Sequence, residues 1–408
     1  MTSQETSSQP PATSIIHLLR AKELGNKRDE QRARSRIAGD ALRTAQEMDI
    51  VADALPGRGR FVAMKFYGGP STSSGSGGKL LAVGTNNGKV GLTGEEQRVP
   101  MWISEPGRKL KTVVDLEWSD DVRLLFSSHA NSVAKLWDLE NGIAIEEYPL
   151  AERAGASSAA RIAWNPERGI LGATRDRGVK IIDIRTAHAE QSLAGDIKVT
   201  AIQWALTAPR VLYAAGTNGN VRIYDTRILK EPMHRRVFEG SFLEDLHLSR
   251  DGHTLFVRAK QWVRSIDAFS LVGHRAKFDT IESSIEIGNC DDGGRSVRVM
   301  DAELFRVRSS LCEAGDAVVV AVPYVFGVHY IDFSRVSSGA QPCHLRQLRG
   351  HGGLVTATAF DSVSQELHTA SQDIFRWRPP MNEEARAAAV RKERPMRREH
   401  GSEDEWSD

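Results

Sequence analysis

Cysteine is scarce in this chain of 408 residues, and net charge is almost absent. Cys290, Cys312 and Cys343 are widely spaced and odd in number, which favours a reducing compartment over a disulfide framework or a zinc site. The 54 basic residues nearly balance the 53 acidic ones, so the whole chain has no electrostatic preference for nucleic acid. There is no apolar run of membrane-spanning length and no secretory start. We expect a soluble intracellular protein, nuclear or cytoplasmic.

Familiar catalytic motifs are also missing. The chain has no HExxH, nucleophile elbow, CxxC pair or kinase signature, and its twelve histidines do not cluster at ligand spacing. We therefore expect no metal, no cofactor and no catalysis. Absent motifs still leave room for a site assembled from separate repeats, because function depends on sites and not on the fold.

A repeat that ends in aspartate dominates the chain. It has the pattern apolar-x-apolar-(aromatic or apolar)-Asp and ends at Asp138, Asp183, Asp225, Asp267 and Asp332. The first spacings are 45, 42 and 42 residues, which is the length of a four-stranded WD40 propeller blade. The next spacing is 65 residues, so we expect an insertion near 279–300.

Seven copies are present when two weaker ones, at 89–94 and 374–380, are counted. Alternating apolar and small residues precede the strong copies, as expected for sheets stacked face to face. The fold prediction is all-β, a seven-bladed WD40 β-propeller preceded by an N-terminal helix-loop-helix. Residues 47–55 precede the first repeat and are predicted to supply the outer strand of the last blade.

The last repeat carries polar residue types that form a buried relay in WD40 blades. They are His351, Ser371, Asp373 and Trp377. Buried polar groups must be satisfied internally, so we interpret them as a structural relay and not as a catalytic site.

Four segments are predicted. Residues 1–13 are Ser/Thr/Gln/Pro-rich and predicted to be disordered, 14–47 form the helix-loop-helix, 48–380 the propeller and 381–408 a charged tail. The helix pair either folds onto the propeller, forms a dimer arm, or inserts into a partner's groove. The tail ends in an acidic run around Trp406.

Arginine follows the closing aspartate by two residues in two adjacent repeats, at Arg185 and Arg227. The simplest interpretation is a solvated charge at the rim of the ring. Two adjacent fork-shaped donors also suit a partner that offers carboxylates or carbonyls.

These features resemble a known family. The resemblance rests on "LLRAKELG" before an Arg-rich helix, "AVPYVFGVHYIDF", "LRGHGGLVTATAFDSVSQELHTASQDIFRW", the ending "EDEWSD" and the two rim arginines. Together they resemble the Cockayne syndrome group A family, WD40 substrate receptors of cullin-4 RING ubiquitin ligases in transcription-coupled repair. Tyr224 and Ile182, where that pattern has tryptophan, depart from it.

The resemblance implies a nuclear, non-catalytic receptor bound to the large damaged-DNA-binding adaptor of the ligase. Further implied partners are the Cockayne syndrome group B-type remodelling ATPase and the RNA polymerase II elongation complex. The implied adaptor contacts are Ile15, Leu18, Leu19, Leu24, Arg34, Arg36, Ile37, Leu42, Arg185 and Arg227.

Two other hypotheses compete with this one. A general WD40 interaction scaffold would use the helices for dimerisation. A nucleic-acid-binding protein would use the basic stretches in the helices and the tail. The second is disfavoured, because those stretches are interleaved with acidic residues and lack aromatic ones.

Overall fold

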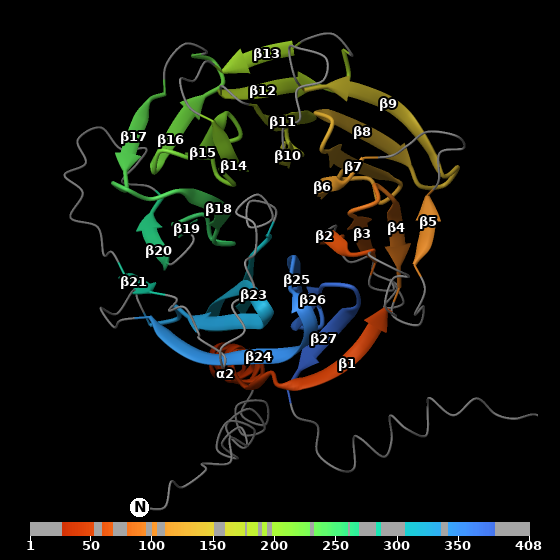
Figure 1. Cartoon of the computed structure of the whole chain (residues 1–408). Coiled ribbons are helices and arrows are strands. Elements are labelled where there is room, and N and C mark those ends of the chain that lie inside the picture. The colour runs from red at the N-terminus through yellow and green to blue at the C-terminus, as the bar shows by residue number, and fades with distance from the viewer. Residues whose placement is uncertain are drawn as a thin grey trace, which may run out of the picture.

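The computed structural model describes residues 27–52, 59–67, 80–94, 100–103, 111–150, 160–175, 178–186, 190–193, 198–228, 232–259, 262–268, 283–286, 307–335 and 342–379. Their strands form seven sheets arranged around a ring, which confirms the predicted seven-bladed β-propeller (Figure 1). The segments at 1–13 and 381–408 lie outside the described residues, and so does the first predicted helix. Within the described part of the chain, no helix has the length and apolar character needed to cross a membrane.

Five consecutive blades each contain four antiparallel strands in chain order, running from the centre of the ring outward (Figure 1). Blade one holds β2 (Phe61–Phe66), β3 (Leu81–Thr85), β4 (Val90–Thr93) and β5 (Met101–Ile103). Blade two holds β6 (Val113–Trp118), β7 (Leu124–His129), β8 (Val133–Asp138) and β9 (Ile143–Pro149). Blade three holds β10 (Ile162–Asn165), β11 (Ile170–Arg175), β12 (Gly178–Asp183) and β13 (Glu190–Leu193).

Blades four and five continue the same pattern. Blade four holds β14 (Val199–Trp204), β15 (Val211–Gly216), β16 (Asn220–Asp225) and β17 (His234–Val237). Blade five holds β18 (Leu243–Leu248), β19 (Thr254–Ala259), β20 (Trp262–Asp267) and β21 (Ser283–Glu286). The aspartate-ended repeats of blades two to five are therefore the third strands of their blades.

The predicted insertion near 279–300 is wrong in part, because β21 lies inside it. This strand pairs with β20 through Trp262 and Glu286 and forms the outer edge of blade five. An outer strand has a solvent-facing side, so "SSIE" lacks the strong apolar signal of the inner strands. Residues 287–300 lie outside the described part of the chain.

Blade six is assigned three strands, β22 (Ser310–Ala314), β23 (Ala317–Asp332) and β24 (Cys343–Leu354). An extended strand of 16 residues would be about 50 Å long. Yet the Phe333 N–H, just beyond β23, donates to the carbonyl of Val318 near its start at 2.8 Å. The strand therefore folds back on itself near Phe326, whose φ is 67°. Its two halves therefore act as the second and third strands of a four-stranded blade.

The last blade is closed by the start of the chain. Strand β1 (Glu47–Ala52) pairs antiparallel with β27 (Ile374–Arg378), outside β26 (Glu366–Ala370) and β25 (Ala357–Asp361). The register places Met48 opposite Trp377 and Ile50 opposite Phe375. This pairing confirms the predicted closure over residues 47–52, and 53–55 lie outside the described part of the chain. It protects an edge that an open ring would expose.

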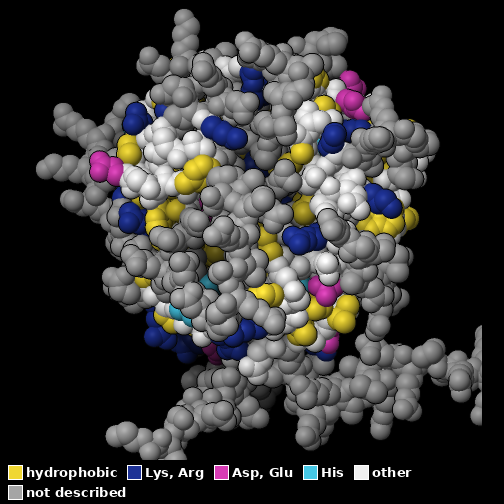
Figure 2. All heavy atoms as spheres, viewed as in Figure 1, with side chains coloured by type: hydrophobic (Ala, Val, Ile, Leu, Met, Phe, Trp, Pro, Cys, Tyr) yellow, Lys and Arg dark blue, Asp and Glu magenta, His cyan; other side chains and the backbone are white. Residues whose placement is uncertain are grey.

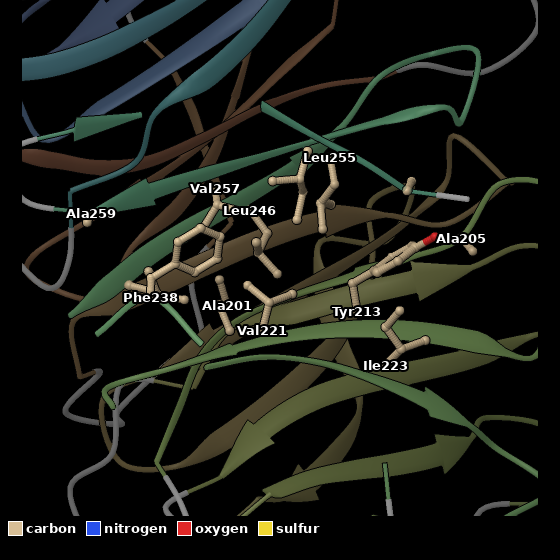
Figure 3. Packing of buried hydrophobic residues seen from close by; sticks show 14 of the residues in the cluster. Ala201, Ala205, Tyr213, Val221, Ile223, Phe238, Leu246, Leu255, Val257 and Ala259 are labelled. Carbon is tan, nitrogen blue, oxygen red and sulfur yellow. The ribbon is translucent and has the colours of Figure 1, made fainter. Parts of the chain in front are cut away.

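The core consists of apolar layers between neighbouring blades. Figure 3 shows the layer between blades four and five, where Tyr213 and Val221 face Leu246 and Val257. Each fully buried side chain of this size contributes about 1.5–3 kcal/mol to stability. Tryptophan adds specific links between blades, since the Trp204 indole donates to the carbonyl of Ala163 at 3.0 Å.

Helix α2 (Lys27–Thr44) packs against blades six and seven, beside β24 and β1 in Figure 1. The helix lies close to blade six at Gly39, where an added Cβ would be 1.9 Å from the Asp316 carboxylate. Arg346 donates to the carbonyl of Arg43 at 2.8 Å and so satisfies the C-terminal end of the helix. The second helix of the predicted pair is thus confirmed and belongs to the propeller body.

Candidate protein-interaction surface

The relay of the last blade exists, with one predicted member replaced. His351 Nδ1 lies 3.0 Å from Asp373 Oδ1, and His351 Nε2 lies 2.7 Å from Thr369 Oγ1. The Trp377 indole N–H donates to the same hydroxyl at 2.8 Å. The predicted Ser371 is instead bonded to the carbonyl of Leu354 at 2.9 Å. Ser371 is therefore a correction: Thr369 is the central hydroxyl.

Strand register explains this replacement. Trp377 pairs with Leu367, so its indole reaches diagonally to Thr369, two residues further along β26 on the same face. Ser371 lies beyond the end of β26 and is out of reach. Burial lowers the pKa of His351, although Asp373 opposes that shift, so the imidazole is neutral at physiological pH.

Blade two contains a second relay that the sequence reasoning missed. The Trp137 indole donates to Ser127 Oγ at 2.7 Å, and that oxygen lies 2.9 Å from His129 Nε2. The available signal was a small hydroxyl residue on the strand before the Trp-Asp pair. The histidine escaped notice because it comes from the same strand as the serine, not from the loop that enters the blade.

The centre of the ring holds a network of paired charges. Arg308, just before β22, bonds to Asp115 on β6 and lies 3.5 Å from Asp245 on β18. A single side chain thereby joins blades two, five and six. Burial raises the pKa of Asp115. Burial also acts to raise the pKa of Asp245, but nearby donors, His247 among them, hold it below its ordinary value.

A serine, a histidine and an aspartate meet in this network. Ser309 Oγ donates to Asp245 Oδ2 at 2.9 Å and lies 2.8 Å from His247 Nε2. The hydroxyl has one proton, which it gives to the carboxylate, so His247 Nε2 must be the donor to Ser309. A histidine that already holds this proton cannot accept one from the serine. The arrangement is a structural buttress and not an activated nucleophile.

One end of the ring is formed by hairpin turns, and we call it the turn face. It consists of the turns between first and second strands together with the turns that follow the third strands. Neighbouring turns are linked, since Tyr67 donates to the carbonyl of Asp120 at 2.9 Å and Asn165 to that of Pro209 at 2.7 Å. These turns expose arginines on blades two to five: Arg123, Arg185, Arg210, Arg227 and Arg250.

The two predicted rim arginines lie on the turn face and behave differently. Arg227 folds back on the buried Asp225, with its Nε 3.0 and 2.9 Å from the two carboxylate oxygens. This hydrogen bond is the main cause that lowers the pKa of Asp225. The side chain of Arg227 is still 64% exposed, so its outer edge faces solvent. Arg227 therefore pairs with Asp225 at the end of β16, whether or not it also contacts a partner.

Arg185 makes no comparable pair with its own aspartate among the described residues. Its backbone N–H donates to Asp183 Oδ1 at 2.9 Å. Its guanidinium lies over Gly169, where a Cβ would approach Nε to 2.9 Å. Gly169 has a φ of 64°, which also favours glycine. Arg185 is therefore exposed, and its guanidinium lies against the backbone of Gly169.

Apolar side chains accompany these arginines. Leu206 and Ile228, in two turns of blade four, are 50% and 54% exposed. The two turns are joined, because the Thr226 N–H donates to the carbonyl of Arg210 at 2.9 Å. Acidic side chains such as Asp121 and Glu167 are also exposed there, so the turn face mixes apolar, basic and acidic groups.

The predicted adaptor contacts of the N-terminal segment divide into three sets. Arg34 and Arg36 are exposed on α2, and Ile37 is half-buried. Leu42 is fully buried among blade-six and blade-seven residues, so this structure offers it to no partner, which corrects the prediction. Four residues lie outside the described part: Ile15, Leu18, Leu19 and Leu24.

Metal-ligating groups do not converge in the described part of the chain. No group of three or more His, Cys, Asp or Glu residues there is arranged so that it could hold a metal ion. Cys312 is buried, which raises the pKa of its thiol to about 12, and Cys343 is exposed. Cys290 lies outside the described residues.

Comparison with solved structures shows the fold of a WD40 β-propeller. The Myceliophteria_thermophila Cps50 (Swd1) β-propeller domain superposes with a TM-score of 0.60 at 17% identity, covering 82% of this chain and 100% of that one. Chaetomium thermophilum Raptor superposes with a TM-score of 0.62 at 13% identity, covering 86% of this chain and 31% of that one.

Sequence comparison finds relatives at low identity. Eukaryotic translation initiation factor 3 subunit I of Drosophila melanogaster is 24% identical over 188 residues, and that of Culex quinquefasciatus is 24% identical over 193. Each match covers 41% of this chain and 56% of the relative, so the chain spans about half the length of the curated relatives it matches. No protein-family model matches. The resemblance to the Cockayne syndrome group A family stays a prediction.

Proposed function

We propose that this protein is a non-catalytic interaction subunit that binds a protein partner through the turn face and α2. In its specific form, the proposal is a nuclear substrate receptor of a cullin-4 RING ubiquitin ligase. The partner at the turn face is then the large damaged-DNA-binding adaptor. The supporting resemblance is that of "LLRAKELG", the last blade and the "EDEWSD" ending to the Cockayne syndrome group A family.

One observation carries the interaction proposal: half-exposed Leu206 and Ile228 stand beside exposed arginines on linked turns. Apolar anchors next to arginine are the residue types that dominate protein interfaces. The acidic residues interspersed on the same face disfavour a nucleic-acid backbone, which requires a continuous basic surface. A protein that offers carboxylates and a small apolar pocket suits this mixed face better.

Helix α2 makes the interaction rigid. It is wedged against blade six through Gly39 and joined to Asp332 by Arg43 at 3.2 Å. A partner that holds its exposed side therefore orients the whole ring. The adaptor contact now proposed for α2 uses Arg34 and Arg36, because the apolar side of the helix is occupied by its own propeller.

The ring would then present its opposite end to substrates. The proposed substrate-side partners are the Cockayne syndrome group B-type remodelling ATPase and the RNA polymerase II elongation complex, in transcription-coupled nucleotide excision repair. A receptor of this kind places its substrate for transfer of ubiquitin by other subunits. It therefore needs shape and rigidity, and no nucleophile of its own.

A second candidate function is supported by the sequence match. The relatives at 24% identity are subunits of translation initiation factor 3, so this chain is alternatively a scaffold subunit of a translation initiation factor. A dimerisation arm made by α2 is the weaker alternative. The positions that a coiled coil would use, Leu42 among them, already pack in the propeller core.

The deciding experiment is co-purification of the full chain with the ligase adaptor. The test variant is Arg185→Glu/Leu206→Asp on the turn face. The matched control is Lys198→Glu/Val237→Asp, which makes the same chemical changes at exposed positions on the opposite end of blade four. Circular dichroism first establishes that all three proteins are folded.

Capture by the wild type and the control, with loss in the turn-face variant, supports the receptor proposal. No capture by the wild type overturns the ligase assignment. Co-purification with translation initiation subunits then favours the second candidate. Equal capture by all three proteins shows that the turn face is not the interface.

A further inference from the structure

An apolar patch lies on the outer strand of blade two. Ile143 and Ile145 on β9 are 55% and 50% exposed. One residue separates them, so they form a patch, unlike the scattered single exposures that are ordinary on protein surfaces. We call Ile143, Ile145 and the exposed Glu146 the β9 patch. Figure 2 shows acidic side chains at the upper right edge of the molecule, where Figure 1 places β9.

A β-bulge directs Ile145 outward. Glu146 lies opposite Leu136 and Ala144 lies opposite Trp137, so Ile145 has no opposite residue on β8. Without this extra residue, Ile145 would lie opposite Trp137 and share the side of the sheet on which that tryptophan is buried. The bulge gives that place to the smaller Ala144, which packs against the core between blades one and two. It therefore leaves an isoleucine exposed.

Other outer strands are short or already engaged. Strands β5, β13, β17 and β21 have only three or four residues. Strand β1 exposes Met48 and Ile50, but its central Asp49 accepts a bond from Arg376 at 3.1 Å. Strand β24 is bonded to α2 through Arg346. Short or charged edges are the usual ways in which sheets avoid unwanted contacts, whereas β9 has seven residues and exposes two isoleucines.

The charges of β9 are acidic at its surface and basic beneath it. Lys135 is buried, and its Nζ pairs with Glu147 at 3.1 Å. Lys180, also buried, donates to the carbonyl of Pro149 at 2.5 Å. Glu146 is exposed and, among the described residues, has no basic partner. Both lysines are used within the fold, and the free charge of the strand is negative.

The neighbouring charges along the chain are balanced. Before β9, Arg123 on the adjoining turn pairs with Glu140 at 3.4 Å. The segment that follows β9, residues 151–159, lies outside the described part and contains one acid and one base, Glu152 and Arg153. The β9 patch therefore combines an apolar surface with a negative charge.

We propose that the β9 patch binds a segment of a partner protein in which apolar side chains stand beside Lys or Arg. The apolar side chains cover Ile143 and Ile145, and the base pairs with Glu146. Apolar contact supplies the affinity, and charge complementarity disfavours acidic competitors. The bulge interrupts the strand edge, so binding uses side chains and does not extend the sheet.

Selection of a phage-displayed library of random dodecapeptides on the immobilised full chain tests the proposal. Clones that also bind the Ile145→Lys/Glu146→Lys variant are removed, which discards peptides that bind elsewhere. We expect the surviving peptides to combine apolar residues with Lys or Arg and to contain few acidic residues. Thermal unfolding first establishes that the variant is as stable as the wild type, as its exposed positions predict.

A labelled surviving peptide then gives affinities by fluorescence anisotropy. We expect saturable binding that weakens as salt rises. Ile145→Lys/Glu146→Lys should weaken binding at least about tenfold, because it removes an apolar anchor and reverses a charge. The matched control is Val237→Lys/Glu239→Lys, which makes the same changes at exposed positions of blade four and should leave binding intact.

The proposal is overturned if no clone survives, if the surviving peptides are acidic or wholly apolar, or if the control loses as much affinity. A wild type that is dimeric in sedimentation velocity, beside a monomeric Ile145→Lys/Glu146→Lys variant, shows that a second copy occupies the patch and also overturns it. The turn-face variant Arg185→Glu/Leu206→Asp should bind the peptide like the wild type, and loss there would place the site on the turn face instead. No adaptor is needed, so this outcome is independent of the proposed function.

Discussion

The arginines at the centre of the ring are removed from solvent and paired with carboxylates, whereas the arginines on the outward side of α2 are exposed. Arg308 and the buried Arg258 are paired with Asp115, Asp245 and Glu244, which come from other strands of the ring. Arg28 and Arg36 are exposed on α2, around a hollow that Asp316 also lines. The central arginines are paired with carboxylates within the chain, whereas Arg28 and Arg36 face solvent.

This difference separates residues that specify the fold from residues that serve recognition. A charge removed from water must be paired within the protein, or stability is lost. An exposed charge costs little to keep and contributes little to stability, so its position is set by what it binds. The comparison therefore predicts large stability effects at the centre and almost none on α2.

The largest expected effect comes from Arg308→Met. The change leaves Asp115 and Asp245 without their shared cation, and we expect a loss of about 3–5 kcal/mol in the free energy of unfolding. Urea titration followed by circular dichroism measures it. Arg123→Met, which removes an exposed pair with Glu140, is the matched control and should change stability by less than about 0.5 kcal/mol. Similar values for both would contradict the comparison.

Leu42→Ala tests whether α2 belongs to the propeller body. Leu42 is fully buried against blades six and seven, so its truncation should cost about 2–5 kcal/mol. Thermal unfolding is the measurement, and the exposed Arg34→Ala is the control on the same helix. If Leu42→Ala left thermal stability unchanged, the helix would be a separable arm, as a dimerisation element requires.

Thr369→Val sharpens the account of the relay. It removes the hydroxyl that contacts both His351 and Trp377, and we expect a loss of about 1–3 kcal/mol. Ser371→Ala removes one bond to a carbonyl and should cost about 1 kcal/mol. If Ser371→Ala proved the more damaging change, the originally predicted relay would be right.

Acid should weaken the fold through a pair of histidines in blade six. His329 Nδ1 lies 2.9 Å from His344 Nε2. Burial, then His344 and Arg349, lowers the pKa of His329 from 6.5 to about 4, and burial lowers that of His344. The unfolded chain therefore binds more protons below pH 6.5, so stability is full above that pH and falls as pH drops toward about 4.

We expect a loss of about 2 kcal/mol between about pH 7 and about pH 5, most of it from His329. Urea midpoints measured across that range test it. His329→Gln should flatten the profile, because the side chain that resists protonation is gone. An unchanged slope in that variant would assign the acid sensitivity elsewhere.

The smallest expected effect on stability is that of Arg28→Glu/Arg36→Glu. Both side chains are exposed, so we expect a change of less than about 0.5 kcal/mol. Thermal unfolding measures it beside Arg308→Met. A large loss would show that these arginines hold the helix in place, and the contrast between the two regions would fail.

The sequence was informative about the ring because its signal is periodic. Aspartates near every 42 residues marked the third strands, and the closing strand followed from the need to complete the last blade. The central network was invisible for the opposite reason. Asp115, Asp245 and Arg308 are far apart along the chain, and only closure of the ring brings them together.

The candidate surface was predicted in part. Arg185 and Arg227 were placed at the rim correctly, but the sequence did not reveal that Arg227 already binds Asp225. Leu42 was predicted to contact the adaptor, but an apolar residue on a helix cannot by itself distinguish the protein's own blade from a partner's groove. The choice of Thr369 over Ser371 depended on the register between β26 and β27, which the sequence alone does not show.

Hydrogen–deuterium exchange of the full chain, with and without the ligase adaptor, tests the central claim most directly. The account predicts slower exchange in the hairpin turns of blades two to four and in α2, with no change at the opposite end of those blades. Protection confined to that opposite end, or no protection anywhere, would contradict a partner site on the turn face.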